Sequence, residues 1–259
     1  MASRMFEVFR WTVSLSAVAG LIGGTLAVKE WSQPEPPEPT VVAKTEAQAD
    51  YIAMDQLDNF RDFPGGSQMT LVKLRTGEHV GSATERFPRP ALSLAKLYLA
   101  DYVFEHGDDN DRDKAREMIE RSSDSLAYEL IEKYPEAISA TAREYGLWST
   151  RAGETWGLST TSTYDVVKFV QAKLEQDPTS PVLEAMKASA AIAADGYGQD
   201  YGTAKLPGAQ GTKWGWSNWY DLHSSVTFGE DFVAAAAVYG SASDLTALVK
   251  RYMEPELMR

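Results

Sequence analysis

The order of strand-like and helix-like segments is the feature that most constrains the fold of this chain. Residues 69–73 (MTLVK) and 79–83 read as a β-hairpin, and residues 212–219, 222–228 and 232–239 read as three successive strands near the C-terminus. Helix-like segments separate the two groups. The sequence therefore predicts an α+β fold, or α/β/α sandwich, whose single antiparallel sheet is built from both ends of the domain.

Apolar residues recur at helical spacing throughout the middle of the chain. The segments concerned are residues 93–105, 113–134, 135–145, 163–174 and 182–194. A further helix is expected at residues 244–253, after the last strand. We expect these helices to cover the sheet.

An uncharged run at residues 11–28 (WTVSLSAVAGLIGGTLAV) predicts one N-terminal transmembrane helix, since crossing a bilayer takes about 20 apolar residues. Arg4 and Arg10 precede the run and glutamates follow it, which predicts a cytoplasmic N-terminus and an extracytoplasmic C-terminal domain. A signal peptide cleaved near residues 25–27 is the alternative interpretation. In either case the bulk of the protein is exported.

Residues 32–40 (SQPEPPEPT) are too rich in proline for a helix or a sheet strand and read as a stiff, solvated spacer. The predicted organisation therefore has three parts. Residues 1–31 form a cytoplasmic stub and membrane anchor (or signal peptide), 32–45 a Pro/Glu-rich linker, and 46–259 the folded domain, with its first helix within residues 41–60.

Composition excludes several classes of function. The formal net charge of −12 disfavours nucleic acid as a partner, because binding to phosphates depends on lysine and arginine. The chain has no cysteine, which excludes disulfides, thiolate metal sites and a cysteine nucleophile. His79, His106 and His223 lie far apart in the sequence, without metal-ligand spacing. We expect no metal site and no cofactor.

The motif with the clearest chemical meaning is Ser93-Leu94-Ala95-Lys96, an S-x-x-K sequence at the start of an apolar helix. Residues three apart on a helix share a face, and a helix N-terminus favours developing negative charge. A desolvated lysine beside a serine can accept its proton and make an acylatable serine without histidine. The alternative is a helix-capping serine beside a solvated lysine.

The context of this motif resembles the class A β-lactamases and penicillin-binding serine hydrolases. Residues 70–96 resemble the family's hairpin, approach segment and S-x-x-K helix start. Residues 118–130 (MIERSSDSLAYEL) resemble the segment of the second motif, S-D-N, and residues 156–174 resemble the threonine-rich helix start after the family's Ω-loop. Residues 211–228 resemble the K-T-G or K-S-G strand. The resemblance extends over residues 69–248.

Two registers of the second motif are open. Apolar positions after the motif favour Ser123-Asp124-Ser125, and a slip by one residue gives Ser122-Ser123-Asp124. In the third motif the resemblance places Lys213-Trp214-Gly215.

The resemblance implies a β-lactamase-like fold and a role for each motif residue. Ser93 is the implied nucleophile, Lys96 its base, Ser123 the proton shuttle and Lys213 an electrostatic and substrate-binding group. Ser125, Gly215 and Trp216 are the implied substrate-binding residues, the Trp216 N–H completing an oxyanion hole with that of Ser93. The implied ligands are β-lactams or peptidoglycan peptides ending in D-Ala-D-Ala.

The sequence departs from the family at three places. Ser125 replaces the motif's asparagine in the favoured register, and Trp214 replaces a hydroxyl residue. No E-x-x-x-N sequence supplies a deacylating glutamate, for which Glu154 is a weak candidate, so efficient β-lactam hydrolysis is not expected. The Ser93-to-Ser123 spacing is also short, which predicts a trimmed helical subdomain.

Two functions follow, and the sequence leaves enzymatic activity open. The first is a membrane-anchored serine hydrolase of low activity on peptidoglycan peptides. The second is a catalytically degenerate β-lactamase-like fold that binds partner proteins in an envelope or membrane complex. The aromatic residues Trp214, Trp216, Trp219 and Tyr220 either line a binding groove or, by alternation along a strand, belong in part to the core.

Overall fold

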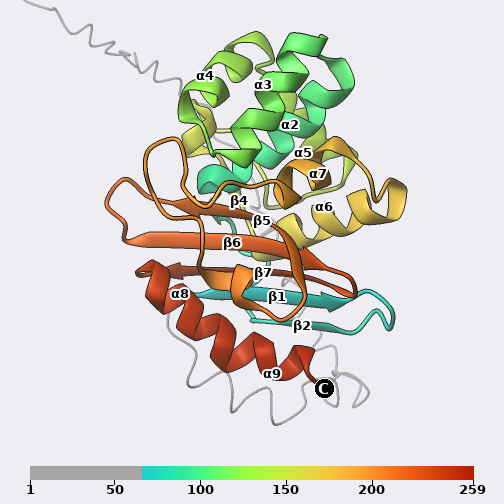
Figure 1. Ribbon diagram of the computed structural model, residues 1–259, viewed down its shortest axis with the longest axis vertical. Helices are drawn as coiled ribbons and strands as arrows, with labels where there is room; N and C mark the ends of the chain where they lie inside the picture. The colour runs from blue at the N-terminus through green and yellow to red at the C-terminus, as the bar shows by residue number, and fades with distance from the viewer. Residues whose placement is uncertain (1–65) are drawn as a thin grey trace, which may run out of the picture. The chain divides into compact units, whose positions relative to one another are not determined.

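The computed structural model describes residues 66–259 (Figure 1). The expected anchor or signal peptide at 1–31, the linker at 32–45 and the helix within 41–60 lie outside the described residues. Between residues 66 and 259, no helix is both long enough and apolar enough to cross a bilayer.

A five-stranded antiparallel sheet forms the centre of the domain, in the order β2-β1-β7-β6-β5. Its strands are β1 (Gln68–Lys73), β2 (His79–Gly81), β5 (Ala209–Trp216), β6 (Leu222–Gly229) and β7 (Phe232–Tyr239). The first and last strands of the chain pair directly, from Gln68 opposite Ala237 to Lys73 opposite Phe232. The prediction of one sheet built from both ends of the domain is therefore confirmed. A separate two-stranded sheet pairs β3 (Arg89–Pro90) with β4 (Thr160–Thr161).

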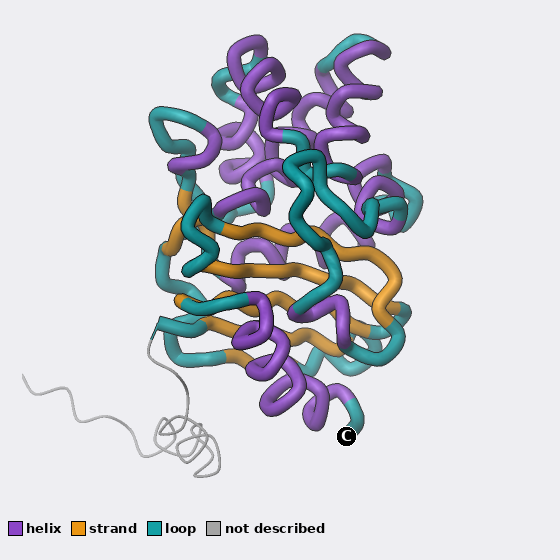
Figure 2. Tube along the Cα trace, turned by 60° about the vertical axis from the view of Figure 1, so that its left-hand side comes forward, coloured by secondary structure: helices purple, strands orange, loops and turns teal. Residues whose placement is uncertain are grey.

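Helices lie on both sides of the sheet, as Figures 1 and 2 show. One side carries α2 (Ala95–His106), α3 (Asp109–Glu120), α4 (Asp124–Lys133), α5 (Ala137–Glu144), α6 (Thr163–Gln176) and α7 (Pro181–Lys187). The other side carries α8 (Ala242–Leu248), a π-helical turn (Val249–Met253) and α9 (Glu254–Leu257). Each face of the sheet has its own apolar core, so the fold is a sandwich of helices, sheet and helices.

Helix α2 is the central helix of the larger layer. Leu97, Tyr98, Leu99 and Ala100 are consecutive and all fully buried, so the helix is covered on every side. A helix that is apolar all round is buried in a core rather than amphipathic on a surface. Residues at its N-terminal end are therefore held in fixed positions.

Two of the helix predictions were wrong in their extent. The single helix expected at 113–134 is broken into α3 and α4, because Ser122 adopts a left-handed conformation (φ 53°) and Ser123 caps α4 by accepting the Leu126 N–H at 3.3 Å. The helix expected at 182–194 ends at Lys187. The chain beyond it bonds instead to the end of α3, through backbone contacts of residues 190 and 194.

Strand β7 owes its central position to four consecutive alanines, Ala234 to Ala237, each at most 1% exposed. Ala235 faces the α2–α7 side, while Ala234 and Ala236 face the α8 side. Small side chains here allow helices on both faces to approach the sheet closely.

Replacement of Ala235 by leucine should lower the free energy of unfolding by about 1–3 kcal/mol, because a packed core has no space for the added atoms. The measurement is urea unfolding at equilibrium. Ala188→Leu, the same change at an exposed helix end, is the control and should change stability by less than about 0.5 kcal/mol. Equal effects at both positions would contradict this account of β7.

Candidate active site

Ser93 lies in a short 3-10 turn (Leu92–Leu94) at the start of α2 and is 6% exposed. The preceding Leu92 has a left-handed backbone (φ 53°). Gly215 of β5 packs against this turn so closely that an added Cβ would lie 3.1 Å from the Ser93 nitrogen and 2.8 Å from the Leu92 Cβ. Glycine is therefore required at 215, and the close contact brings the backbone of β5 beside the N–H of Ser93.

Four polar side chains form a continuous hydrogen-bonded chain from Ser93 into the sheet. The Lys96 Nζ lies 3.0 Å from the Ser93 Oγ and donates to the Ser122 carbonyl oxygen at 2.7 Å. The Lys213 Nζ, on β5, donates to the Ser122 Oγ at 2.7 Å. The Lys96 Nζ also lies 3.5 Å from this hydroxyl. The start of α2 and strand β5 therefore both contact Ser122, which lies between α3 and α4.

The serine between the lysines is Ser122, and the placement of Ser123 there was wrong. The buried Ser123 hydroxyl caps α4 and lies 3.0 Å from the Oγ of the exposed Ser125 in the first turn of that helix. The left-handed turn at Ser122 directs its own side chain inward instead. The geometry matches the alternative register, Ser122-Ser123-Asp124, and leaves Ser125 outside the hydrogen-bonded chain.

In this register an acidic residue follows at the third position of the motif. Asp124 accepts from the Lys96 Nζ at 2.6 Å, although its side chain is 60% exposed. On another side the ring of Trp156 has its centroid 4.5 Å from the same nitrogen, a cation–π contact. Lys96 is thereby enclosed by Ser93, Ser122, Asp124 and an aromatic ring.

The two lysines are fully buried, and this controls their protonation. Burial lowers the pKa of Lys96, and the nearby Asp124 carboxylate partly opposes that shift. Burial, together with the positive charge of Lys96, lowers the pKa of Lys213 well below 10.5. Among residues 66–259, Lys96 has a carboxylate partner at hydrogen-bonding distance and Lys213 has none, so Lys213 is the first of the two to lose its proton as the pH rises.

The tryptophans of β5 lie away from Ser93. Trp214 is 6% exposed on the α8 side of the sheet, where its Nε1 donates to the Tyr201 carbonyl oxygen at 2.9 Å. Its interpretation as a core residue is confirmed, so it does not obstruct the serine. Trp216 is half-buried and donates from Nε1 to Asp195 at 3.0 Å. Trp219 and Tyr220, at the hairpin, are exposed.

Sequence patterns did not identify Trp156 or Asp195 as parts of this site. Trp156 immediately precedes the threonine-rich segment, and Asp195 directly follows the segment 182–194 that was expected to be helical. The Asp195 carboxylate acts on the pKa values of both buried lysines. Glu154 is exposed and is not among the hydrogen-bonding partners of Ser93 or Lys96.

The three histidines do not gather at one place. The His223 ring is fully buried and bonds to the Gly240 carbonyl oxygen and the Tyr197 hydroxyl, whereas His79 pairs with Glu85. Within residues 66–259 there is no group of three or more histidine or acidic side chains that could hold a metal ion.

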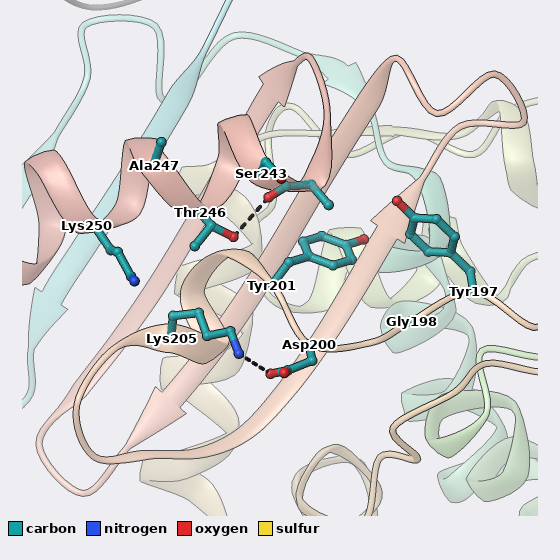
Figure 3. A pocket seen from close by; sticks show the side chains of 10 residues that line it. Tyr197, Gly198, Asp200, Tyr201, Lys205, Ser243, Thr246, Ala247 and Lys250 are labelled. Atoms are coloured by element: carbon teal, nitrogen blue, oxygen red, sulfur yellow. Dashed lines mark hydrogen bonds and ion pairs between the residues drawn. The ribbon is translucent and has the colours of Figure 1, made fainter.

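A separate hollow of about 680 Å³ lies on the α8 side of the sheet, between α8 and residues 197–205 (Figure 3). Lys205 and Asp200 form an ion pair of 2.6 Å on its wall. None of the hydrogen-bonded residues at Ser93 lines it. The candidate active site at Ser93 and this hollow are therefore distinct.

No family model and no curated protein matches this chain in sequence. Solved structures match it closely in fold. A β-lactamase from Burkholderia vietnamiensis aligns with a TM-score of 0.59 at 15% identity, over 80% of this chain and 99% of its own. A class A β-lactamase from Mycobacterium abscessus aligns with a TM-score of 0.63 at 12% identity, over 80% and 99%.

A third similar structure is penicillin-binding protein D2 from Listeria monocytogenes in its cefotaxime-bound form, with a TM-score of 0.57 at 16% identity, over 74% of this chain and 97% of its own. These similarities span nearly the whole of each solved chain. The protein therefore has the β-lactamase and penicillin-binding-protein fold in a divergent sequence.

The free energy of unfolding should depend on pH in a way that reveals the protonation of Lys213. Because the unfolded chain keeps this lysine's proton to a higher pH than the folded chain, the unfolded state binds more protons in the window below 10.5. The free energy of unfolding should then rise with pH, by up to about 1.4 kcal/mol per pH unit per proton. Lys213→Met should flatten this rise in denaturant titrations at pH values below 10.5.

Lys187→Met is the control for that experiment, since Lys187 lies on the surface of α7. Its stability profile should run parallel to that of the unsubstituted protein. A Lys213→Met profile with the same slope as both would show that Lys213 keeps its proton in the folded state.

Proposed function

We propose that this protein is an acyl-serine enzyme of the β-lactamase and penicillin-binding type, with Ser93 as its nucleophile. The observation that carries the proposal is the unbroken chain of hydrogen bonds from Ser93 through Lys96 and Ser122 to Lys213. Each member is buried, and each comes from a different place in the sequence except the S-x-x-K pair.

Stability alone does not account for this arrangement. Removing two ammonium groups from water is costly, and apolar side chains of similar size usually fill such space at no loss. Buried groups with displaced pKa values, converging on a serine, are instead typical of catalytic sites. A role in catalysis would explain why the protein keeps two buried lysines that lower its folding stability.

The proposed reaction begins with attack of the Ser93 Oγ on a carbonyl carbon. Its proton passes to an uncharged Lys96, or through Lys96 and Ser122 to Lys213, as the new C–O bond forms. The N–H groups of Ser93 and Trp216 hold the oxyanion. As the C–N bond breaks, Ser122 donates its proton to the leaving nitrogen and receives in turn the proton that Lys96 or Lys213 took from Ser93. Water then hydrolyses the acyl ester.

Deacylation is the slow step in this proposal. Asp124, the carboxylate that contacts Lys96, is engaged in an ion pair, and the Trp156 ring covers the adjacent space. Neither side chain is a free base for water. The acyl-enzyme should therefore be long-lived, which favours penicillin binding or a low-activity peptidase over efficient β-lactam hydrolysis.

The proposed substrates are peptidoglycan peptides, with β-lactams as reactive analogues. Similar folds include a D-alanyl-D-alanine carboxypeptidase from Mycobacterium tuberculosis, with a TM-score of 0.52 at 17% identity over 71% of this chain and 89% of its own. The uncharged run at residues 11–28 supports an extracytoplasmic location on a membrane anchor. That location would bring the site to the cell wall.

One observation favours the second candidate, a binding or accessory subunit without turnover. The Ser93 side chain is almost inaccessible, and the ion pair of Lys96 with Asp124 stabilises the ammonium form that cannot accept a proton. In that case the protein would keep the fold and the buried lysines but would catalyse no reaction. Acylation distinguishes the two functions.

Incubation with benzylpenicillin should give one covalent adduct by intact-mass spectrometry, absent in Ser93→Ala. Ser122→Ala should acylate roughly 10²- to 10⁴-fold more slowly, since it removes a proton-transfer group. Ser123→Ala is the matched control. It should acylate at nearly the original rate and lose about 1 kcal/mol of stability through the helix cap. Folded protein that forms no adduct would reject the enzymatic proposal.

The same adduct should persist after free penicillin is removed, because Asp124 is engaged in an ion pair and the Trp156 ring covers the space beside it, so that no free base activates water. The decay of adduct mass over hours measures this. Release within seconds would contradict the slow-deacylation argument while leaving Ser93 as the nucleophile.

A further inference from the structure

A second hollow, of about 360 Å³, lies at the C-terminal end of α5. It is lined by the last turn of this helix and by the following loop, which includes Gly146, Trp148 and Arg151. Its volume falls at the lower end of the range for small-molecule sites. We call it the α5 hollow.

Two arginines line the α5 hollow without a carboxylate partner among residues 66–259. Arg143, in the last turn of α5, has no hydrogen bond or ion pair from its guanidinium within this part of the chain. Arg151 donates from Nη1 to the neighbouring Thr150 carbonyl oxygen at 2.7 Å. In a protein with 37 acidic and 25 basic residues, such unpaired arginines in one hollow indicate a site for an anion.

The other charged groups around the hollow leave it positive. The Lys168 Nζ, from α6, donates to the Gly146 carbonyl oxygen at 2.9 Å. Asp165 is buried and turned inward, where its Oδ2 accepts from the Ser149 N–H and the Thr150 hydroxyl. Glu144 lies toward Glu105 and Asp101, and its own partial burial, together with their negative charges, raises its pKa. Arg143 and Arg151 therefore line the hollow, while the nearby Asp165 carboxylate is turned into the protein.

An exposed aromatic ring completes the α5 hollow. Trp148 is 80% exposed, although its neighbours Leu147 and Thr150 are buried. Thr150, which also lines the hollow, is held by hydrogen bonds to Thr161 and Asp165, so this part of the wall is firmly positioned. A flat indole in this setting offers a stacking surface for a ligand ring.

We propose that the α5 hollow binds a small sugar ring that carries a carboxylate or phosphate group. Arg143 and Arg151 bind the anion, because planar guanidinium groups match carboxylate and phosphate oxygens in geometry. Trp148 stacks on the ring. This site is separate from Ser93, and its occupation does not depend on acylation there.

The test is calorimetric titration of the full chain with N-acetylmuramic acid and with its uncharged counterpart N-acetylglucosamine. A parallel pair, glucose 6-phosphate and glucose, tests phosphate against carboxylate. At least one acid should bind with a dissociation constant in roughly the millimolar range or tighter, and about tenfold tighter than its uncharged partner. Added salt should weaken that binding.

Variants locate the binding. Arg143→Gln and Arg151→Gln should each weaken it about tenfold, and Trp148→Ala should weaken it several-fold. Arg116→Gln, which removes an exposed guanidinium of α3, is the matched control and should bind normally. All four positions are exposed, so folding should be retained.

Three outcomes would overturn the proposal. They are the absence of binding by both acids, equal binding of the uncharged sugars, and binding that neither arginine substitution weakens. Inorganic phosphate that binds as tightly as glucose 6-phosphate would reject the role of Trp148. Because none of these measurements uses Ser93, failure here leaves the acyl-serine proposal untouched, and a missing penicillin adduct leaves the α5 hollow untouched.

Discussion

The site depends on the convergence of two buried ammonium groups on Ser122. This contact joins the edge strand β5, the start of α2 and the break between α3 and α4, which are remote from one another in the chain. Two positive charges cannot share one hydroxyl in a dry interior without a large penalty. Burial therefore lowers the pKa of both lysines, and the Asp124 carboxylate favours the charged form of Lys96.

Backbone strain is concentrated at the same place. Of the three non-glycine residues with positive φ in the described chain, Leu92 precedes the proposed nucleophile and Ser122 holds the two lysines. Such conformations cost about 1–3 kcal/mol each and persist only where the surrounding structure over-determines them. Here the buried helix α2 and the close contact of Gly215 supply that constraint.

Asp124 and Trp156 are the two side chains that make rapid hydrolysis at this site unfavourable. An aspartate stabilises the charged form of Lys96 more than an uncharged side chain would, and the indole ring reduces the access of water to it. Both effects slow steps that need a neutral lysine or an activated water. In the proposed reaction the charged form of Lys96 slows acylation, and the lack of a free base for water slows deacylation.

The sequence by itself determined the strands at both ends, the helical middle and the S-x-x-K pair, because periodicity and short spacing are local properties. It also placed Lys213 and Gly215 on one face of a strand and Trp214 on the other. Only the tertiary structure decided that Ser122, and not Ser123, lies between the lysines, since a single left-handed residue between two helices reverses which side chain points inward. The tertiary structure alone brought Trp156 over Lys96. It also left Arg143 and Arg151 around one hollow without acidic partners among residues 66–259, because such contacts join segments whose separation carries no sequence pattern.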